Sequence, residues 1–249
     1  MLRPGDGMRL TGEVRNNIGQ PPGAEALRKL IGLILRVAPI GIGALTAAAI
    51  GRHGSSLFGP LAVFIGGVWL CHAVMFVLYL ALMFAFTRRS PWRFLRQSAP
   101  LYSTAAATCS SLASLVVSME IAERNLKLPR GVYALTLPLG AQLNKDGTAI
   151  TLLGVLLFTA QAANVRFSFS SLLTAALLAL ILAGSSGAIP GGGLVMALLF
   201  VKSFQLPVEI AVIIGGVYRL LDMGNTTINC MADLVGTVIV ADREAEAAN

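Results

Sequence analysis

The chain has 249 residues, of which 55% are apolar and only 12% are charged, and its mean hydropathy is +0.75. Soluble domains usually carry about a quarter charged residues, so this composition predicts an integral membrane protein. The net charge of +7 comes mostly from Lys and Arg in short segments between apolar runs, where positive charge sets membrane topology. It therefore does not indicate nucleic-acid binding.

The reactive side chains do not form a catalytic pattern in the sequence. Three cysteines, Cys71, Cys109 and Cys230, are scattered through apolar segments at spacings that fit neither a metal site nor a disulfide framework. No nucleophile is paired with a base in the sequence, and His and Cys do not cluster as metal ligands would. The sequence therefore predicts a protein that is not an enzyme and that holds no cofactor.

The first part of the chain predicts two transmembrane helices. Residues 30–51 and 57–86 are each apolar over enough length to cross about 30 Å of hydrocarbon. The basic segment "TRRSPWRFLRQ" follows and marks the cytoplasmic side. We therefore expect a polar cytoplasmic leader (1–27), two spans within 28–97 and a cytoplasmic tail (242–249). Both termini would face the cytoplasm from a cell (inner or plasma) membrane.

Residues 98–241 are expected to form a core of interrupted helices. The segment 98–124 is polar at its centre and basic at both ends, so both ends belong on the cytoplasmic side. A helix of about 11 residues is about 16 Å long and cannot span, so we predict a re-entrant hairpin that turns at Ser110–Ser111. A second hairpin is predicted at 168–203, because five glycines and a proline within 184–193 forbid a continuous helix.

Between these hairpins lies an apolar span that is interrupted by Asn144, Lys145 and Asp146. After the second hairpin, residues 208–241 predict one long helix with charges inside it. Non-helical backbone at membrane depth survives only where it is buried in protein or lines a wet cavity. Paired interrupted segments indicate the midplane site of a transporter, where half-helix N-termini face an anionic group and unwound carbonyls coordinate a cation.

Five stretches carry a resemblance to one family. "LPLGAQLNKDGTA" resembles the "PLGATxNMDGTA" signature of the dicarboxylate/amino acid:cation symporters, the glutamate-transporter family, and "GSSGAIPGGG" resembles the tip of its second hairpin. "LLDMGNTTINCMADLVGTVIVA" resembles its last helix, "TCSSLAS" more weakly its first hairpin, and "RVAPIGIGAL" the start of its fifth span. The likeness extends over about residues 28–243, in the family's order.

The resemblance implies an all-α integral membrane fold. Its parts would be a scaffold span and a transport-domain span, a re-entrant hairpin, a broken span, a second re-entrant hairpin and a final polar span. It implies a secondary active transporter, namely a sodium symporter of amino acids or dicarboxylates with an elevator-like movement. The partners that it implies are the lipid bilayer and further copies of the chain in a homotrimer. Family members have eight spans, so we expect a chain truncated at its N-terminus. The alternative is a non-transporting fragment or the assembly partner of a split transporter.

Polar side chains follow one face of the last predicted helix. They are spaced four, three and four residues apart and therefore share that face: Asp222, Thr226, Asn229 and Asp233. Ionisable groups inside a span are costly and usually functional. The resemblance implies that Asp222 accepts the substrate's α-ammonium and that Thr226 and Asn229 hold its α-carboxylate. The substrate-binding set that it implies is Ser110, Ser111, Thr148, Ile189, Gly193, Asp222, Asn225, Thr226 and Asn229.

The resemblance also implies cation sites, because carboxylate, amide and carbonyl oxygens suit a dehydrated alkali cation. Asp233 with Asn144 would bind one sodium ion. Asp146 with Asn144 would serve another, whose remaining ligands belong to the family's third span. The implied cation-binding set is Gly140, Gln142, Asn144, Asp146, Ala183, Ser186, Asn229 and Asp233. The coupling ion is expected to be sodium or a proton.

Three residues depart from the family pattern. Asn225 replaces an arginine that pairs with an acidic side chain of the substrate, and an amide cannot form that charge-assisted pair, so we expect a neutral amino acid as substrate. Cys109 replaces an arginine common at the first hairpin tip. Lys145 replaces the methionine of "NMDGT". Arg219, three residues before Asp222, would restore one lost positive charge, pair with that carboxylate or extend to lipid headgroups.

Lys145 leads to a specific expectation about ion coupling. Its ammonium, next to Asp146 and Asp233, would occupy the space of a sodium ion. It would repel a second cation by roughly 4 kcal/mol at about 4 Å and an effective dielectric of about 20. We then expect weakened or absent sodium coupling at one site, with uniport or proton coupling in its place. The alternative is that Lys145 turns away and pairs locally with Asp146.

Overall fold

The computed structural model describes residues 58–187 and 191–247, together with the single helical positions 40, 47 and 51. The leader 1–27 and nearly all of the first predicted span, 30–51, lie outside the described residues. Within the described part every regular element is a helix, which confirms the all-α class. The elements are α3 (Phe58–Thr87), α4 (Pro91–Thr108), α5 (Ser111–Glu120), η2 (Ile121–Asn125), α6 (Arg130–Leu143), α7 (Asp146–Ala162), α8 (Phe169–Gly184), α9 (Gly192–Ser203), α10 (Val208–Val212), η3 (Ile213–Gly216) and α11 (Tyr218–Ala247).

The second predicted span is confirmed as a helix. α3 has 30 residues and is about 45 Å long at 1.5 Å per residue, more than the hydrocarbon core requires. Its segment Gly59–Thr87 is the one helix of the described part that is long and apolar enough to cross a membrane. Only 17% of its most apolar stretch is buried within the protein, so most of its side chains are free to contact lipid.

The first predicted hairpin region begins earlier than the sequence suggested. Ser90 caps α4 and Pro91 occupies its first turn, so most of the basic segment "TRRSPWRFLRQ" is already helical. The turn between α4 and α5 lies at Cys109–Ser110, one residue before the predicted turn, and Ser111 is the first residue of α5. Cys109 has the left-handed φ of 51° that reverses the chain there, and α4 packs against α5.

The predicted interruption of the middle span is present. α6 ends at Leu143 and α7 begins at Asp146, and neither Asn144 (ψ 115°) nor Lys145 (φ −139°) is helical. The two halves have 14 and 17 residues, about 21 and 26 Å, so neither alone reaches the roughly 30 Å of a bilayer core. Two helix ends therefore meet inside the protein.

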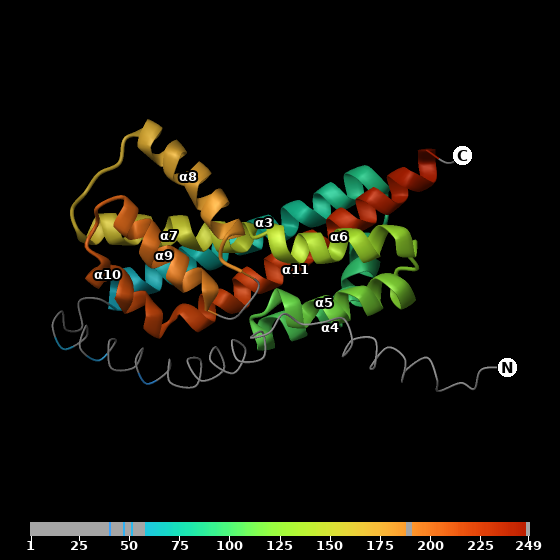
Figure 1. Cartoon of the computed structure of the whole chain (residues 1–249), viewed down its shortest axis with the longest axis horizontal. Helices are drawn as coiled ribbons and strands as arrows, with labels where there is room; N and C mark the ends of the chain where they lie inside the picture. The colour runs from blue at the N-terminus through green and yellow to red at the C-terminus, as the bar shows by residue number, and fades with distance from the viewer. Residues whose placement is uncertain (1–39, 41–46, 48–50, 52–57, 188–190, 248–249) are drawn as a thin grey trace, which may run out of the picture. The chain divides into compact units, whose positions relative to one another are not determined.

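The last two predicted segments differ in how closely the structure follows them. α8 and α9 fill the second hairpin region, and Figure 1 shows α8 extending away from α7 at the top of the view. The single helix predicted for 208–241 is instead α10, the 3₁₀ turn η3 and α11, because the paired glycines at the end of η3 are poor helix formers. α11 also continues to Ala247, past the predicted boundary at 241.

α11 is the central helix of the described part and contacts α3, α4, α5, α6 and α7 (Figure 1). Its first turn joins one apolar cluster, formed mainly with α3, α7, α8 and α9. Its second half joins another, formed mainly with α4, η2 and α6. The stretch from Asp222 to Asn229 lies between these clusters and carries most of the polar side chains that we singled out.

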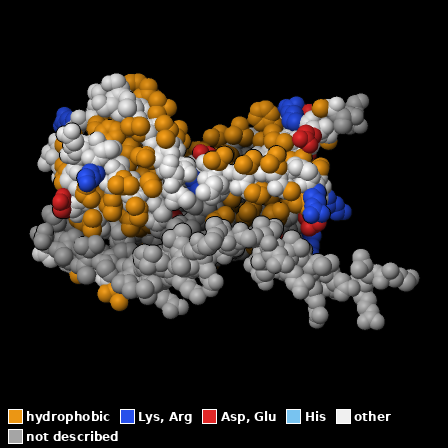
Figure 2. Space-filling model, in the orientation of Figure 1, with side chains coloured by type: hydrophobic (Ala, Val, Ile, Leu, Met, Phe, Trp, Pro, Cys, Tyr) orange, Lys and Arg blue, Asp and Glu red, His pale blue; other side chains and the backbone are white. Residues whose placement is uncertain are grey.

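Charged side chains lie largely at the ends of the described helices. Figure 2 shows hydrophobic side chains over much of the visible described surface, and a group of charged ones near the C-terminal end of α11. There Arg89 makes a two-pronged pair with Asp242, its Nε 2.9 Å from Oδ2 and its terminal nitrogen 2.6 Å from Oδ1. This pair joins the segment after α3 to the end of α11.

Candidate functional site

The polar face of α11 is buried in the middle of the described part. Asp222, Asn225, Thr226, Asn229 and Asp233 are each 8% exposed or less. Polar groups removed from water are costly unless they find hydrogen-bond partners. Their partners come chiefly from the break between α6 and α7, which faces this side of α11.

Asn229 connects α11 to the first turn of α7. Its Oδ1 accepts a hydrogen bond from the Gly147 backbone N–H at 2.8 Å, and its Nδ2 donates to Thr148 Oγ1 at 3.3 Å. The first N–H groups of a helix have no partner inside the helix, so this side chain satisfies one of them. The contact fixes the start of α7 beside α11, and it engages both ends of the Asn229 amide.

Asp233 and Asn144, the pair expected at one cation site, are brought together. Asn144 Nδ2 donates to Asp233 Oδ1 at 2.9 Å and lies 3.4 Å from the Asn229 carbonyl oxygen. Gly140 of α6 lies against the same carboxylate, and a Cβ at that position would be 2.5 Å from Asp233 Oδ1. Glycine is therefore required for α6 to approach α11 this closely.

Asp146, the other expected cation ligand, faces a different helix. Its carboxylate accepts a hydrogen bond from the hydroxyl of Tyr79 on α3. Of the ion pairs in the described part of the chain, none joins Asp146 to Lys145. The local pair that we considered as an alternative for Lys145 is thus not formed in this structure.

Lys145 instead points toward the start of α5. It is only 4% exposed, and its Nζ donates to the Ala141 carbonyl at 2.5 Å and to Ser111 Oγ at 3.1 Å. The first contact closes the end of α6, where a lysine is well placed to bind a terminal carbonyl. The second ties the break to the helix that follows the turn at Cys109–Ser110.

These groups enclose a small polar cavity of about 10 Å³. A space of this size holds about one water molecule, so an amino acid would require the walls to move apart. Asp222 Oδ2 accepts a hydrogen bond from the Gly191 N–H at 3.1 Å beside this cavity. The wall is formed by Cys109, Ser111, Lys145, Thr148, Ser186, Gly187, Gly193, Asp222, Thr226 and Asn229.

The cavity brings together most of the expected substrate residues, but Asn225 is not on its wall. Asn225 is fully buried, with its amide 2.6 Å from Thr151 Oγ1. When the Asn225 amide is oriented with its nitrogen toward Thr151, this nitrogen also donates to the Gly147 carbonyl at 2.9 Å. Its side chain therefore points toward α7 and away from the cavity, although it lies between Asp222 and Thr226 on α11.

Several other expected residues also lie outside the wall. Ser110 caps α5 through a bond to the Ala113 N–H, and Ile189 falls outside the described residues. Gln142 is exposed on α6, and Ala183 is buried on α8. Arg219 donates to the Ala107 carbonyl at 3.0 Å, near the end of α4.

Tyr79 and His72 of α3 were not predicted as part of the site. Tyr79 provides the partner of Asp146, and a tyrosine in an apolar span is a usable signal because its hydroxyl needs a partner when buried. The His72 ring is 2% exposed, and its Nε2 lies 3.2 Å from the Gly147 carbonyl oxygen. α3 thus contributes two polar contacts next to the break.

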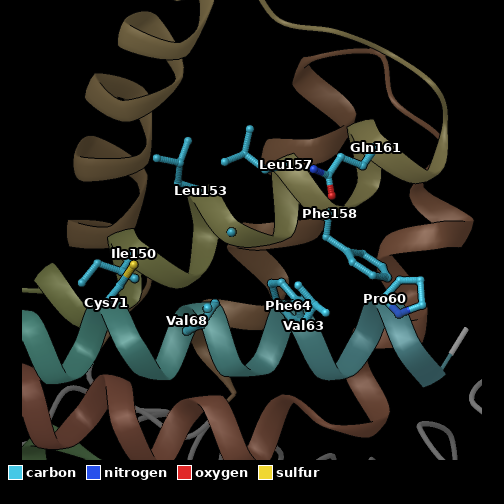
Figure 3. Close-up of a pocket in the computed structure, with 12 residues that line it drawn as sticks. Pro60, Val63, Phe64, Val68, Cys71, Ile150, Leu153, Leu157, Phe158 and Gln161 are labelled. Carbon is cyan, nitrogen blue, oxygen red and sulfur yellow. The ribbon is translucent and has the colours of Figure 1, made fainter.

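A second cavity, between α3 and α7, has a different chemical character (Figure 3). It has a volume of about 590 Å³ and no charged residue on its lining. Gly154 lies against Val68, where a Cβ would be 2.9 Å from a methyl group, so the two helices are close there. Apolar side chains such as Val63, Leu153 and Leu157 line it, which does not suit an ion or a zwitterion.

A polar, charged cavity between apolar helices, one of them long enough to span a bilayer, is characteristic of membrane transporters. The chain belongs to the sodium:dicarboxylate symporter family, whose pattern matches residues 22–243. This is a family of transporters and not of enzymes, in agreement with the sequence-based prediction. The chain is therefore a membrane protein of a transport family.

Named relatives show what similar chains do. The chain is 36% identical over 222 residues to excitatory amino acid transporter 1 of Ambystoma tigrinum, an alignment that covers 87% of this chain and 40% of the relative. It is 34% identical to the human protein of that name, with the same coverage. It is 30% identical to the proton/glutamate-aspartate symporter of Bacillus subtilis (strain 168), covering 89% of this chain and 53% of the relative. The chain thus spans about half or less of these relatives.

Proposed function

We propose that the protein is a secondary active transporter that moves an amino acid across a cell membrane together with sodium ions or protons. The cavity between the α6–α7 break and α11 carries this proposal, because it places two opposite charges, Asp222 and Lys145, among hydroxyl and amide groups in an apolar protein. Such groups are costly at membrane depth and are usually retained for a ligand. The names of the relatives support an amino-acid substrate and proton coupling, and the name of the family supports sodium coupling.

In this proposal the pairs α4–α5 and α8–α9 are the two re-entrant hairpins. α5 and α9 have 10 and 12 residues, about 15 and 18 Å, which is too short to cross a bilayer. The tip of each pair contributes to the cavity wall, through Ser111 and Ser186. The part of the protein that contains the cavity would move between the two membrane faces in an elevator-like manner. Both termini would lie in the cytoplasm, and further copies of the chain would be its partners.

The substrate whose charges best match the side chains of the cavity wall is a neutral amino acid. Asp222 would accept its α-ammonium, and the Thr226 hydroxyl would help to hold its α-carboxylate. A second carboxylate would need a positive charge at Asn225, which has none and faces α7. The proposal therefore separates this chain from the relatives that are named for glutamate and aspartate.

The cation sites that we propose combine the family resemblance with the contacts of the Asn144–Asp233 pair. Asn144, Asp233 and the Asn229 carbonyl would provide oxygens for one ion, beside Gly140. Asp146, held by Tyr79, would serve a second, and Gln142, Ala183 and Ser186 would belong to a third. Lys145 lies next to these groups, and its fixed positive charge would weaken sodium binding at one of them.

Reconstitution of the full chain into liposomes tests this function. Uptake of radiolabelled L-serine and L-aspartate is measured with an inward sodium gradient, with an inward proton gradient and without a gradient. We expect gradient-driven accumulation of L-serine above that of L-aspartate. Uptake no greater than in protein-free liposomes under every gradient would contradict the proposal and favour a non-transporting assembly partner.

The role of Lys145 in coupling needs its own comparison. In the Lys145→Met variant the fixed charge is removed and a methionine, the residue of the family signature, takes its place. We expect uptake by this variant to depend more steeply on sodium concentration than uptake by the wild type. An equally steep dependence in both proteins would refute the idea that the ammonium replaces a sodium ion.

A further inference from the structure

The described wall of the cavity holds two charged side chains of opposite sign. Asp222 comes from α11, and Lys145 comes from the break between α6 and α7. No ion pair of the described residues joins them. Each charge is therefore available to a ligand that carries the complementary group.

Lys145 is incompletely satisfied by the protein. An ammonium group has three N–H donors, and two of them are used by the Ala141 carbonyl and the Ser111 hydroxyl. Both acceptors are neutral, and the side chain is 4% exposed. Asp233 and Asp222 are near enough to act on the ammonium electrostatically, but neither forms an ion pair with it. A buried cation without a directly bonded carboxylate is unfavourable, so an anionic group that enters the cavity and contacts Lys145 would gain from this site.

The amide and guanidinium groups near the cavity that could receive a substrate carboxylate are engaged elsewhere. The Asn229 amide is bound at both ends, to Gly147 and Thr148. Asn225 faces α7, and Arg219 is bound to the Ala107 carbonyl. On the described wall, Lys145 is thus the remaining positive charge.

We propose that Lys145 is a specificity-determining residue that binds the α-carboxylate of the substrate while Asp222 binds its α-ammonium. This inference rests on the proposed transport function and defines its substrate class. The two wall charges match one ammonium and one carboxylate, so the cavity selects zwitterions with a neutral side chain. A substrate with a second carboxylate leaves one negative charge unpaired, which disfavours it in a desolvated site.

Binding measurements on the purified full chain test this assignment. Isothermal titration compares L-serine with L-serine amide, which keeps the ammonium but lacks the carboxylate, on the wild type and on Lys145→Met. Lys202→Met, which removes an exposed lysine at the end of α9, is the matched control. Charge-assisted hydrogen bonds imply that Lys145→Met loses about tenfold to a hundredfold in affinity for L-serine but little for the amide. The control should bind like the wild type.

If Lys145 only closed the end of α6 and did not contact the substrate, its replacement would change the affinities for L-serine and for L-serine amide to the same extent. The Lys145→Gln variant keeps a donor for the Ala141 carbonyl and removes the charge, so it provides a second test if the methionine variant does not fold. Unchanged preference for L-serine over its amide in either folded variant would overturn the assignment of Lys145. A wild type that binds neither L-serine nor L-aspartate, with or without sodium, would instead overturn the proposed function, and the assignment with it.

Discussion

Adding one methyl group at Gly140 should disturb the Asn144–Asp233 pair with little change to the rest of the fold. A Cβ there would lie 2.5 Å from Asp233 Oδ1 and 2.8 Å from its Cγ, whereas ordinary contacts begin at 3.4 Å. The carboxylate would have to move by nearly 1 Å, and its 2.9 Å hydrogen bond with Asn144 would be lost or bent. Overpacking of this kind costs about 1–3 kcal/mol, against a gain of about 0.5–1 kcal/mol from replacing a helical glycine.

We therefore expect Gly140→Ala to lower the stability by about 1–2 kcal/mol and to weaken the stabilisation that added sodium provides. Gly236→Ala is the control, because a Cβ at that exposed position of α11 meets nothing within 4 Å. Thermal unfolding in detergent is measured across a sodium series, with potassium at constant ionic strength. If Gly140→Ala melts like Gly236→Ala and responds equally to sodium, the close approach of α6 to Asp233 has no role in ion binding.

Three further variants test the surrounding contacts. Gly147→Ala should cost about 3 kcal/mol and impair expression, because its Cβ would lie 2.6 Å from a backbone oxygen of α11, which cannot rotate away as a side chain does. Tyr79→Phe should lose about 1–3 kcal/mol by leaving the Asp146 carboxylate without its hydroxyl partner, and part of that loss should be recovered by sodium in the same melting assay. Arg89→Gln should cost no more than about 1 kcal/mol, since the pair that it breaks is partly exposed, and the cost should shrink at high salt. Unchanged melting of Gly147→Ala would be the most damaging of these results.

The helix interruption in the middle span could be predicted from chemistry alone. Three consecutive polar residues at 144–146 cannot contact lipid, and the structure ends one helix at Leu143 and starts the next at Asp146. The start of α4 was missed although its signal was present. Ser90 followed by Pro91 is a helix-start pattern, but we used this basic segment only to assign the cytoplasmic side.

The candidate site was predictable as a helix face but not in its details. The spacing from Asp222 to Asp233 correctly indicated a shared, buried face of α11. Whether Asn225 would face the cavity could not be read from spacing, because it lies at the edge of that face and its direction depends on packing against α7. The contact of Lys145 with Ser111 could not be predicted either. It joins residues 34 positions apart, and their approach depends on how α5 and α6 pack together.

A crystal structure of the full chain grown with L-serine and sodium would test the central claim most directly. The account predicts ligand density in the cavity between α5, the α6–α7 break and α11, with the ammonium within hydrogen-bond distance of Asp222 and the carboxylate within hydrogen-bond distance of Lys145 Nζ. Ligand bound in the apolar cavity between α3 and α7, or bound with its carboxylate directed away from Lys145, would contradict the account.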